Sequence, residues 1–179
     1  MELKIKGQII NLRKLTKSDA FSIFQNAKDK KISRYTTLPY HYKLKHAQDF
    51  IKKTHQNQKR KTAYELGIEL KETGKIIGMM SLMKINYDNR NAEVGYWLGK
   101  KYWGQGIAKE ALKLILDLGF KKLKLSRIYA RVMHPNIASA KLLESVGFKF
   151  EGRLRKATLK NKRWLDDLRY GLLKEEYKK

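Results

Sequence analysis

The segment that most restricts the fold is a strand, a glycine-containing loop and a helix in direct succession, followed by a second strand. Residues 92–99, AEVGYWLG, have a strand pattern, and residues 102–111, YWGQGIAKEA, lead into a helical pattern that extends to residue 123. A further strand, RIYARVMH, covers residues 127–134. A helix that connects two neighbouring strands in this way makes them parallel. The sequence therefore predicts one parallel step in the sheet.

The rest of the chain predicts antiparallel strands and helices. Strands are expected over residues 9–15, 63–86 as a hairpin around the turn ETGK, and 152–173 as two strands about an Asn-Lys turn. Further helices are expected over residues 16–28, 46–61 and 135–148, the first of them opened by a Thr16–Asp19 capping pattern. We therefore expect a single α+β domain over residues 1–179, with a mixed, mostly antiparallel central sheet flanked by helices.

Several kinds of site and location are excluded or disfavoured by composition. The chain has no cysteine, which excludes disulfides, thiolate nucleophiles and cysteine-based zinc sites. Its four histidines lack metal-ligand spacing, so no metal is expected. No apolar run is long enough to cross a bilayer, and residues 1–15 lack the apolar core of a signal peptide. We expect a cytoplasmic protein without membrane association.

The net charge is unusually positive. Lysine and arginine number 41 against 17 acidic residues, which gives a formal charge of +24. Such a field attracts polyanions, among them RNA and phosphate-rich cofactors. Because the basic residues are spread over the whole chain, they equally suit the solvated surface of a protein from a lysine-rich proteome. Charge alone leaves both interpretations open.

The glycine loop has the features of an anion site. Gly104 and Gly106 stand at the start of the predicted helix, where several amide groups lack an intrahelical acceptor and the helix dipole favours negative charge. Neither glycine has a side chain that would block a phosphate, and Ala108 adds only a methyl group to the next turn. The alternative is that the glycines serve only the turn geometry. The pattern is neither a P-loop nor a dinucleotide fingerprint.

Three long segments resemble a known family. Residues 92–120, 127–152 and 160–176 closely resemble the GCN5-related N-acetyltransferases (GNAT), specifically the branch that acetylates the N-termini of ribosomal proteins. GQIINLRKLTKSDA near the start and ISRYTTLPY at residues 32–40 also resemble that branch. The resemblance implies the acyl-CoA N-acyltransferase fold. In that fold the strand before the glycine loop splays from its parallel neighbour, and acetyl-CoA lies in the resulting V.

The resemblance implies an acetyl-CoA site made of a strand edge, the glycine loop and one asparagine. The implied cofactor-binding residues are Tyr96, Trp97 and Leu98 for the pantetheine arm, Trp103, Gly104, Gln105, Gly106, Ile107, Ala108 and Lys109 for the pyrophosphate, and Asn136 for the arm. Trp103 stands where the family has glutamine or arginine, which removes one polar contact. For Asn136 an ordinary helix N-cap is the alternative.

The resemblance also implies direct attack of an amine on the thioester, without a covalent enzyme intermediate. Many relatives protonate the thiolate with a tyrosine, but that position here is Leu143. Ser139 matches a serine proposed for this role in the ribosomal-protein branch, with packing beside the cofactor as its alternative. Glu93 is the candidate base, directly or through a water, and a cross-strand ion pair is its alternative. Asp166 and Asp167 are alternative bases, with a structural role favoured for Asp167.

The expected acceptor is the α-amino group of a protein N-terminus, with ribosomal proteins as the first class to consider. The loop ISRYTTLPYHY, with Tyr35, Tyr40 and Tyr42, and the last hairpin would line the acceptor pocket, unless these tyrosines only pin the loop to the core. The positive charge disfavours polycationic acceptors such as spermidine and suits work close to the ribosome or RNA. A small-molecule amine or antibiotic acetyltransferase, or a non-catalytic RNA-binding or ribosome-binding protein, are the alternatives. A homodimer is implied by the resemblance alone.

Overall fold

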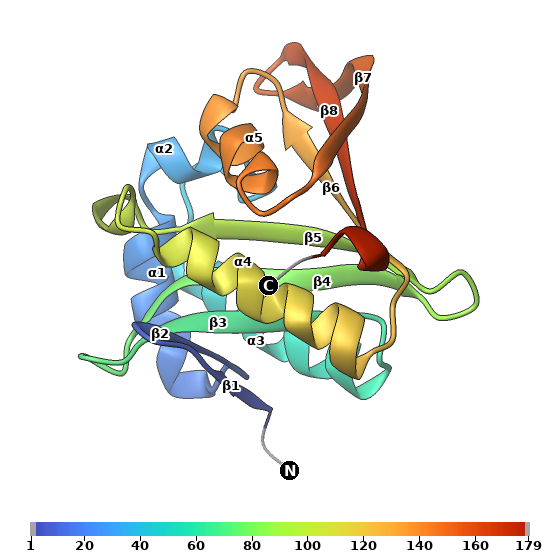
Figure 1. Ribbon diagram of the computed structural model, residues 1–179. Coiled ribbons are helices and arrows are strands. Elements are labelled where there is room, and N and C mark those ends of the chain that lie inside the picture. Colours follow the sequence, from blue (N-terminus) through green and yellow to red (C-terminus); the bar gives the residue numbers. More distant parts are fainter. Residues whose placement is uncertain (1–2, 178–179) are drawn as a thin grey trace.

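The computed structural model describes residues 3–177, in which a mixed eight-stranded sheet is the central element. The strand order is β1-β2-β3-β4-β5-β6-β8-β7, and β5 and β6 are the parallel pair (Figure 1). The strands are β1 (Lys4–Lys6), β2 (Ile10–Arg13), β3 (Tyr64–Leu70), β4 (Ile76–Asn86), β5 (Asn91–Leu98), β6 (Arg127–Met133), β7 (Lys149–Lys160) and β8 (Arg163–Leu173). The α-helices are α1 (Ala20–Ala27), α2 (Lys30–Ser33), α3 (Leu44–Lys59), α4 (Ile107–Asp117) and α5 (Ile137–Glu144).

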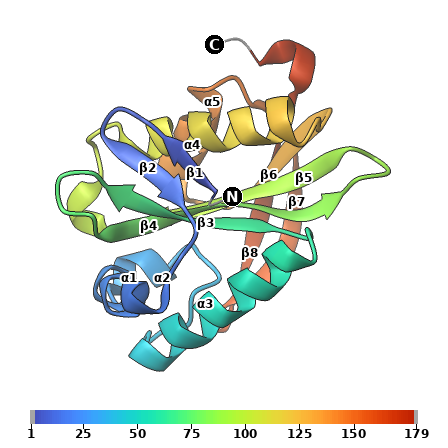
Figure 2. The ribbon, with the colours of Figure 1, turned by 90° about the horizontal axis from the view of Figure 1, so that it is seen from below.

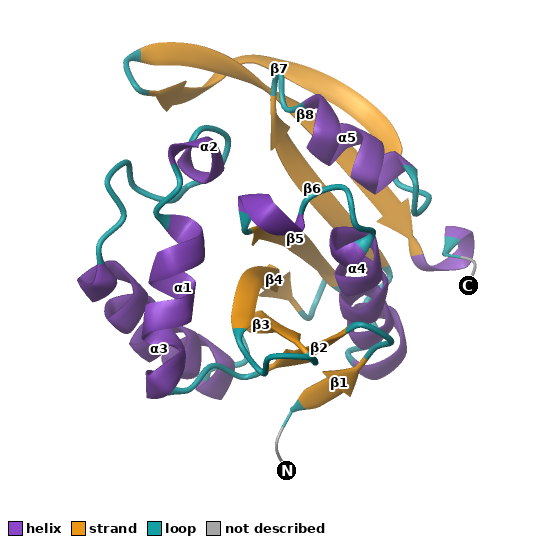
Figure 3. Ribbon diagram, turned by 90° about the vertical axis from the view of Figure 1, so that its left-hand side faces the viewer, coloured by secondary structure: helices purple, strands orange, loops and turns teal. Residues whose placement is uncertain are grey.

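Helices cover both faces of the sheet. α4 and α5 lie on one face, and α1, α2 and α3 lie on the other (Figures 2 and 3). Strand β4 contributes to both cores, because Met80 packs in the cluster that contains Leu112 of α4, whereas Met79 packs with Ile23 of α1 and Ile51 of α3. A strand that is buried on both faces has a nearly continuous apolar sequence, as IIGMMSL does here.

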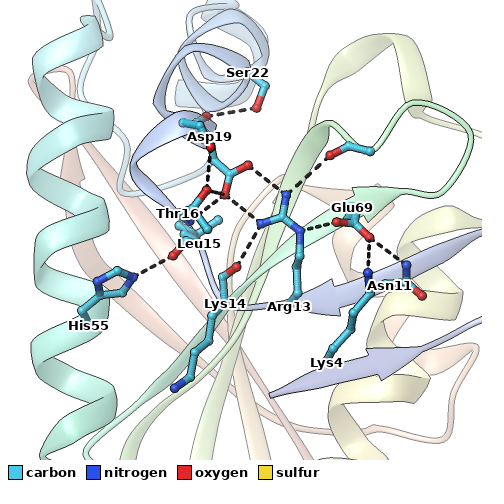
Figure 4. Close-up of polar contacts among 12 residues, drawn as sticks. Lys4, Asn11, Arg13, Lys14, Leu15, Thr16, Asp19, Ser22, His55 and Glu69 are labelled. Carbon is cyan, nitrogen blue, oxygen red and sulfur yellow. Dashed lines mark hydrogen bonds and ion pairs between the residues drawn. The ribbon is translucent and has the colours of Figure 1, made fainter. Parts of the chain in front are cut away.

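A network of charged side chains ties the first strands to α1 (Figure 4). Arg13 donates to both carboxylate oxygens of Asp19, at 2.8 and 2.9 Å, and its Nε donates to Glu69 of β3. Asn11 Nδ2 and Lys4 Nζ lie 2.8 and 3.0 Å from Glu69 Oε1. Burial by itself would raise the pKa of Glu69, but the hydrogen bonds from Asn11, Arg13 and Lys4 outweigh it and lower that pKa to about 2.

Most of the predicted elements are confirmed, as is the α+β class with one parallel step. Thr16 donates its backbone N–H to the Asp19 carboxylate at 2.7 Å, which is half of the predicted capping box. The last hairpin turns at Asn161 and Lys162, both with positive φ. Two elements were not predicted. Strand β1 precedes the strand expected over residues 9–15, and the short helix α2 lies between the helices expected over residues 16–28 and 46–61.

Gly7 marks a close contact between the sheet edge and α4. A Cβ atom at this position would clash with the Glu110 carboxylate and would lie 2.8 Å from the Ile10 carbonyl oxygen. Separately, no helix between residues 3 and 177 is long and apolar enough to span a membrane.

Candidate functional site

Strands β5 and β6 separate towards their C-terminal ends. Residues 91–94 of β5 pair with residues 127–130 of β6. Beyond that point, within the described residues, β5 continues to Leu98 paired with β4 alone, and β6 continues to Met133 paired with β8 alone. A V-shaped separation therefore opens within the sheet (Figure 1). We call this opening the β5–β6 gap.

The backbone of β5 presents unpaired groups to the β5–β6 gap. The Gly99 N–H donates to a carbonyl of β4 at 2.8 Å, and hydrogen-bonded and non-hydrogen-bonded pairs alternate along an antiparallel ladder. Trp97 therefore bonds to β4, whereas the backbone groups of Tyr96 and Leu98 point towards the gap. The Leu98 carbonyl accepts a hydrogen bond from the Trp103 indole N–H at 2.7 Å. Of the three residues predicted for the strand edge, Trp97 is thus the one directed away.

The glycine loop lies at the wide end of this gap. Gly104 and Gly106 have φ values of 74° and 75°, and a Cβ atom at either would meet no atom within 4 Å. The backbone N–H groups of residues 104–109 donate to no acceptor within residues 3–177. Trp103 differs, because its backbone N–H donates to the Lys100 carbonyl. The glycines therefore serve the turn geometry and also leave amides open to an anion at the positive end of α4.

A lysine-lined cavity of about 670 Å³ adjoins the glycine loop. Lys6, Lys109 and Lys113 line it between the start of α4 and the β1–β2 connection. Glu110 also lines it and accepts hydrogen bonds from the backbone N–H groups of residues 8–9, which holds that connection against α4. The three ammonium groups give this surface a charge that suits phosphates.

The side chain of Tyr96 extends from β5 to the first turn of α5. Its hydroxyl oxygen lies 2.8 Å from Ser139 Oγ and 3.3 Å from the Ser139 carbonyl oxygen. Burial raises the pKa of Tyr96 to about 12, and the Ser139 hydrogen bond offsets only part of that rise. The Ser139 N–H donates to Asn136 Oδ1 at 3.3 Å, so Asn136 has the N-cap role given as its alternative. Leu143 is fully buried in the core.

Glu93 lies on the opposite face of the sheet from Ser139. It shares its face of β5 with Trp97, which packs against the α1–α3 core, whereas Tyr96 packs against the core under α4. Glu93 is 6% exposed, and its Oε2 accepts from Lys84 Nζ at 2.7 Å. This is the cross-strand ion pair given as the alternative for Glu93. A role for Glu93 as base stays a prediction.

The two alternative bases are engaged inside the last hairpin. Asp167 is 1% exposed and accepts from Thr158 Oγ1 at 2.9 Å, which is the structural role favoured for it. Asp166 accepts from the Lys156 backbone N–H at 2.8 Å and from Arg153 at 2.6 Å, and these hydrogen bonds lower the pKa of Asp166. Both carboxylates therefore help to hold the hairpin together.

Lys160, at the end of β7, connects the hairpin to the loop between α2 and α3. Its Nζ donates to the carbonyl oxygens of Thr36 and Leu38 at 2.8 and 3.2 Å. The structure thus brings together the two segments that were expected to border the acceptor pocket. The sequence signal for this contact was weak, because one lysine among many carries no indication of its partner.

The three tyrosines of that loop have different environments. Tyr42 is buried in the core with α1 and α3, and burial raises the pKa of Tyr42 to about 12. It therefore pins the loop, as the alternative interpretation states. Tyr40 is 46% exposed, and Tyr35 is half-buried beside the Arg34 guanidinium. These two are free to contact an acceptor.

Comparisons of the sequence and of the structure with known proteins all find acetyltransferases. The profile described as "Acetyltransferase (GNAT) domain" matches residues 10–149. The uncharacterized N-acetyltransferase p20 of Bacillus licheniformis is 35% identical over 168 residues, 94% of each chain. The ribosomal-protein-S5-alanine acetyltransferase of Vibrio fischeri has a TM-score of 0.87 at 25% identity, covering 99% of this chain and 100% of that one. The microcin C7 self-immunity acetyltransferase MccE, solved with acetyl-CoA and AMP, has a TM-score of 0.83 at 25% identity and 93% coverage of both chains.

Proposed function

The chain belongs to the acetyltransferase (GNAT) domain family and is an N-acetyltransferase, and on this premise we propose that it transfers the acetyl group of acetyl-CoA to the α-amino group of a protein N-terminus. Ribosomal proteins are the first candidates, in view of the similarity to the S5-alanine enzyme. The observation that carries the proposal is the row of free N–H groups at residues 104–109 beside the β5–β6 gap.

The residues around the gap fit acetyl-CoA. The free N–H groups of residues 104–109 would hold the pyrophosphate, and Lys109 adds positive charge beside them. The backbone edge of Tyr96 would pair with the amides of the pantetheine arm. Bound acetyl-CoA supplies the thioester carbon that the amine attacks. Trp103 fits less well as a direct contact, because its backbone and indole N–H groups are both used within the loop.

The reaction forms a C–N bond and breaks a C–S bond. The nitrogen releases one proton, and the sulfur finally takes one up. The Leu98 backbone N–H, which points into the gap, would stabilise the oxyanion that develops on the acyl oxygen. The Ser139 hydroxyl, on the α5 side of the gap, would donate a hydrogen bond to the departing sulfur. The amine would approach from the opposite face, where Glu93 and the α2–α3 loop lie.

The state of the carboxylates favours an α-amine as acceptor. A free α-amino group has a pKa of about 7.7 to 8.0 and is partly neutral at physiological pH, whereas a lysine near 10.4 is almost entirely protonated. Glu93, Asp166 and Asp167 each accept hydrogen bonds from other side chains. An acceptor that needs little help from a base therefore suits this site better. The charge of +24 also disfavours a polyamine.

A panel of acceptors tests the proposal through release of free CoA. The panel holds a lysine-free peptide that starts with alanine or serine, a peptide with a blocked N-terminus and one internal lysine, and spermidine. We expect turnover with the first peptide and none with the blocked peptide. Faster turnover of the blocked peptide or of spermidine would contradict the proposal.

A small-molecule amine is the second candidate acceptor. The similarity to MccE, a self-immunity enzyme solved together with AMP, is the observation that favours it. Including an aminoacyl nucleotide analogue in the same panel separates the two candidates. Turnover of this analogue without turnover of the free peptide would assign the chain to small-molecule acetylation.

A further inference from the structure

We propose that Tyr96 is a positioning residue for Ser139. The Tyr96 hydroxyl donates a hydrogen bond to one lone pair of Ser139 Oγ, so that the single hydroxyl proton of the serine points into the β5–β6 gap. The inference rests on the proposed use of that gap for acetyl-CoA. Tyr96 was selected from the sequence for its backbone alone, and the contact of its side chain with α5 gives it a second role.

The other serine and threonine side chains of the α-helices, together with Ser145 directly after α5, show what Ser139 would do without Tyr96. They donate to the carbonyl of the residue three positions earlier, as Ser22 does to Asp19, Ser33 to Lys30, Thr54 to Ile51 and Ser145 to Leu142, at 2.8 to 3.1 Å. The corresponding partner of Ser139 is the Asn136 carbonyl. Within residues 3–177 that carbonyl accepts from the Ala140 N–H and not from Ser139 Oγ. Ser139 thus departs from the pattern at the one serine that contacts Tyr96.

The distance between the two hydroxyl oxygens allows either to donate, and we assign Tyr96 as the donor from the chemistry of the two groups. A separation of 2.8 Å is typical of an O–H···O hydrogen bond, whereas the 3.3 Å to the Ser139 carbonyl is longer than that range. A phenol is also a stronger acid than an aliphatic alcohol, so the tyrosine proton is the one shared. A serine hydroxyl has one proton and two acceptor lone pairs. With Tyr96 on one lone pair, the serine proton must point elsewhere.

Tyr96 keeps its own proton during the reaction. Its pKa of about 12 lies far above that of a thiol, about 8.5, so the tyrosine does not transfer a proton to a thiolate. It acts through Ser139, whose hydroxyl donates to the sulfur as the C–S bond breaks. The position left without a donor by Leu143 is therefore served by two residues from different elements, β5 and α5.

A matched control is available at the other end of α5. Tyr170 of β8 is 4% exposed, and its hydroxyl donates to Glu144 of α5 at 3.0 Å. The variant Y170F therefore loses a strand-to-α5 hydrogen bond just as Y96F does, but away from Ser139. Any effect of Y96F that Y170F shares reflects packing of α5, and any effect that only Y96F shows reflects the Ser139 contact.

The first test measures the thiol of bound CoA and needs no acceptor. The thiolate is followed by its ultraviolet absorbance while pH is varied for wild type, Y96F, S139A and Y170F. We expect the wild type to lower the pKa of the bound thiol, and Y96F and S139A each to raise it by about one pH unit, which is the size of one charge-assisted hydrogen bond. Y170F should match wild type. A wild-type value in Y96F would overturn the inference.

The second test is a double-mutant cycle in acetyl transfer. We expect Y96F to lower kcat about tenfold with little change in the KM for acetyl-CoA, and the double variant to be no slower than S139A alone. Additive losses, or a rise in KM alone, would contradict action through Ser139. A shifted thiol pKa without turnover of any acceptor would refute the proposed function and leave the role of Tyr96 intact. Turnover of an acceptor together with a wild-type pKa of the bound thiol in Y96F would support the proposed function and refute the role of Tyr96.

Discussion

The charge network around Arg13 and the glycine loop before α4 treat polar groups in opposite ways. In the network each of the three buried charged groups has at least two partners: Arg13 joins Asp19 and Glu69, Asp19 also accepts from Thr16, and Glu69 also accepts from Asn11 (Figure 4). In the loop a row of backbone N–H groups has no acceptor within residues 3–177. Polar groups that are satisfied internally stabilise the fold, and those left open at a helix N-terminus are available to a ligand.

The difference predicts that stability and ligand binding can be changed separately. The Arg13, Asp19 and Glu69 side chains are each no more than 13% exposed, so their partners are needed to compensate for lost hydration. The loop glycines lie in open space, where a Cβ atom at Gly104 or Gly106 would contact no other part of the protein within 4 Å. Damage to the network should therefore lower the free energy of unfolding, and damage to the loop should lower affinity.

The largest effect is expected from Arg13→Met. This change leaves Asp19 and Glu69 buried without their shared cation, which costs about 3 to 5 kcal/mol of unfolding free energy. Urea unfolding measures this loss, and calorimetry should show unchanged acetyl-CoA affinity for the folded variant. Arg127→Met is the matched control, because Arg127 and Glu151 are 34% and 38% exposed and their pair contributes about 1 kcal/mol or less. Equal losses in the two variants would contradict the distinction.

A somewhat smaller loss of unfolding free energy is expected when the pH is lowered. Because the pKa of Glu69 is about 2 in the folded protein and 4.5 ordinarily, the carboxylate stabilises the fold above pH 4.5, and this contribution disappears as pH falls towards 2. The free energy of unfolding should decrease by about 3 kcal/mol over that range, measured by urea unfolding at a series of pH values. Glu69→Gln should flatten the dependence. An equally steep dependence in that variant would show that other carboxylates cause it.

The third effect lies on the other side of the comparison. Gly106→Trp places a large side chain over the open N–H groups and should weaken acetyl-CoA binding by about 100-fold or more, measured by calorimetry. The left-handed φ of 75° adds about 1 to 2 kcal/mol of strain. Gly74→Trp is the control, because Gly74 has a φ of 65° and equally open space in the distant ETGK turn. Unweakened acetyl-CoA binding by Gly106→Trp would show that the loop glycines serve only the turn geometry.

Much of the site could be predicted because its pieces are local. The glycines, the helix that follows and the period-two pattern that divides Glu93 from Tyr96 all depend on residues close together in sequence. The pairing of β5 with β6 over residues 91–94, and their separation beyond, agrees with the splay that the family resemblance implied. Catalytic roles for Glu93 and Ser139 stay predictions.

Local patterns in the sequence were enough to predict the order of most elements, the parallel step and the open amides before α4, because backbone propensity and hydrophobic period act over a few neighbouring residues. Which side chains meet became known only from the packing of the elements in three dimensions. Lys84 meets Glu93 across a strand pair, Tyr96 meets Ser139 across 43 positions, and Lys160 meets Thr36 across 124. Such contacts depend on how β5, α5 and β7 pack in space, and no local pattern carries that information.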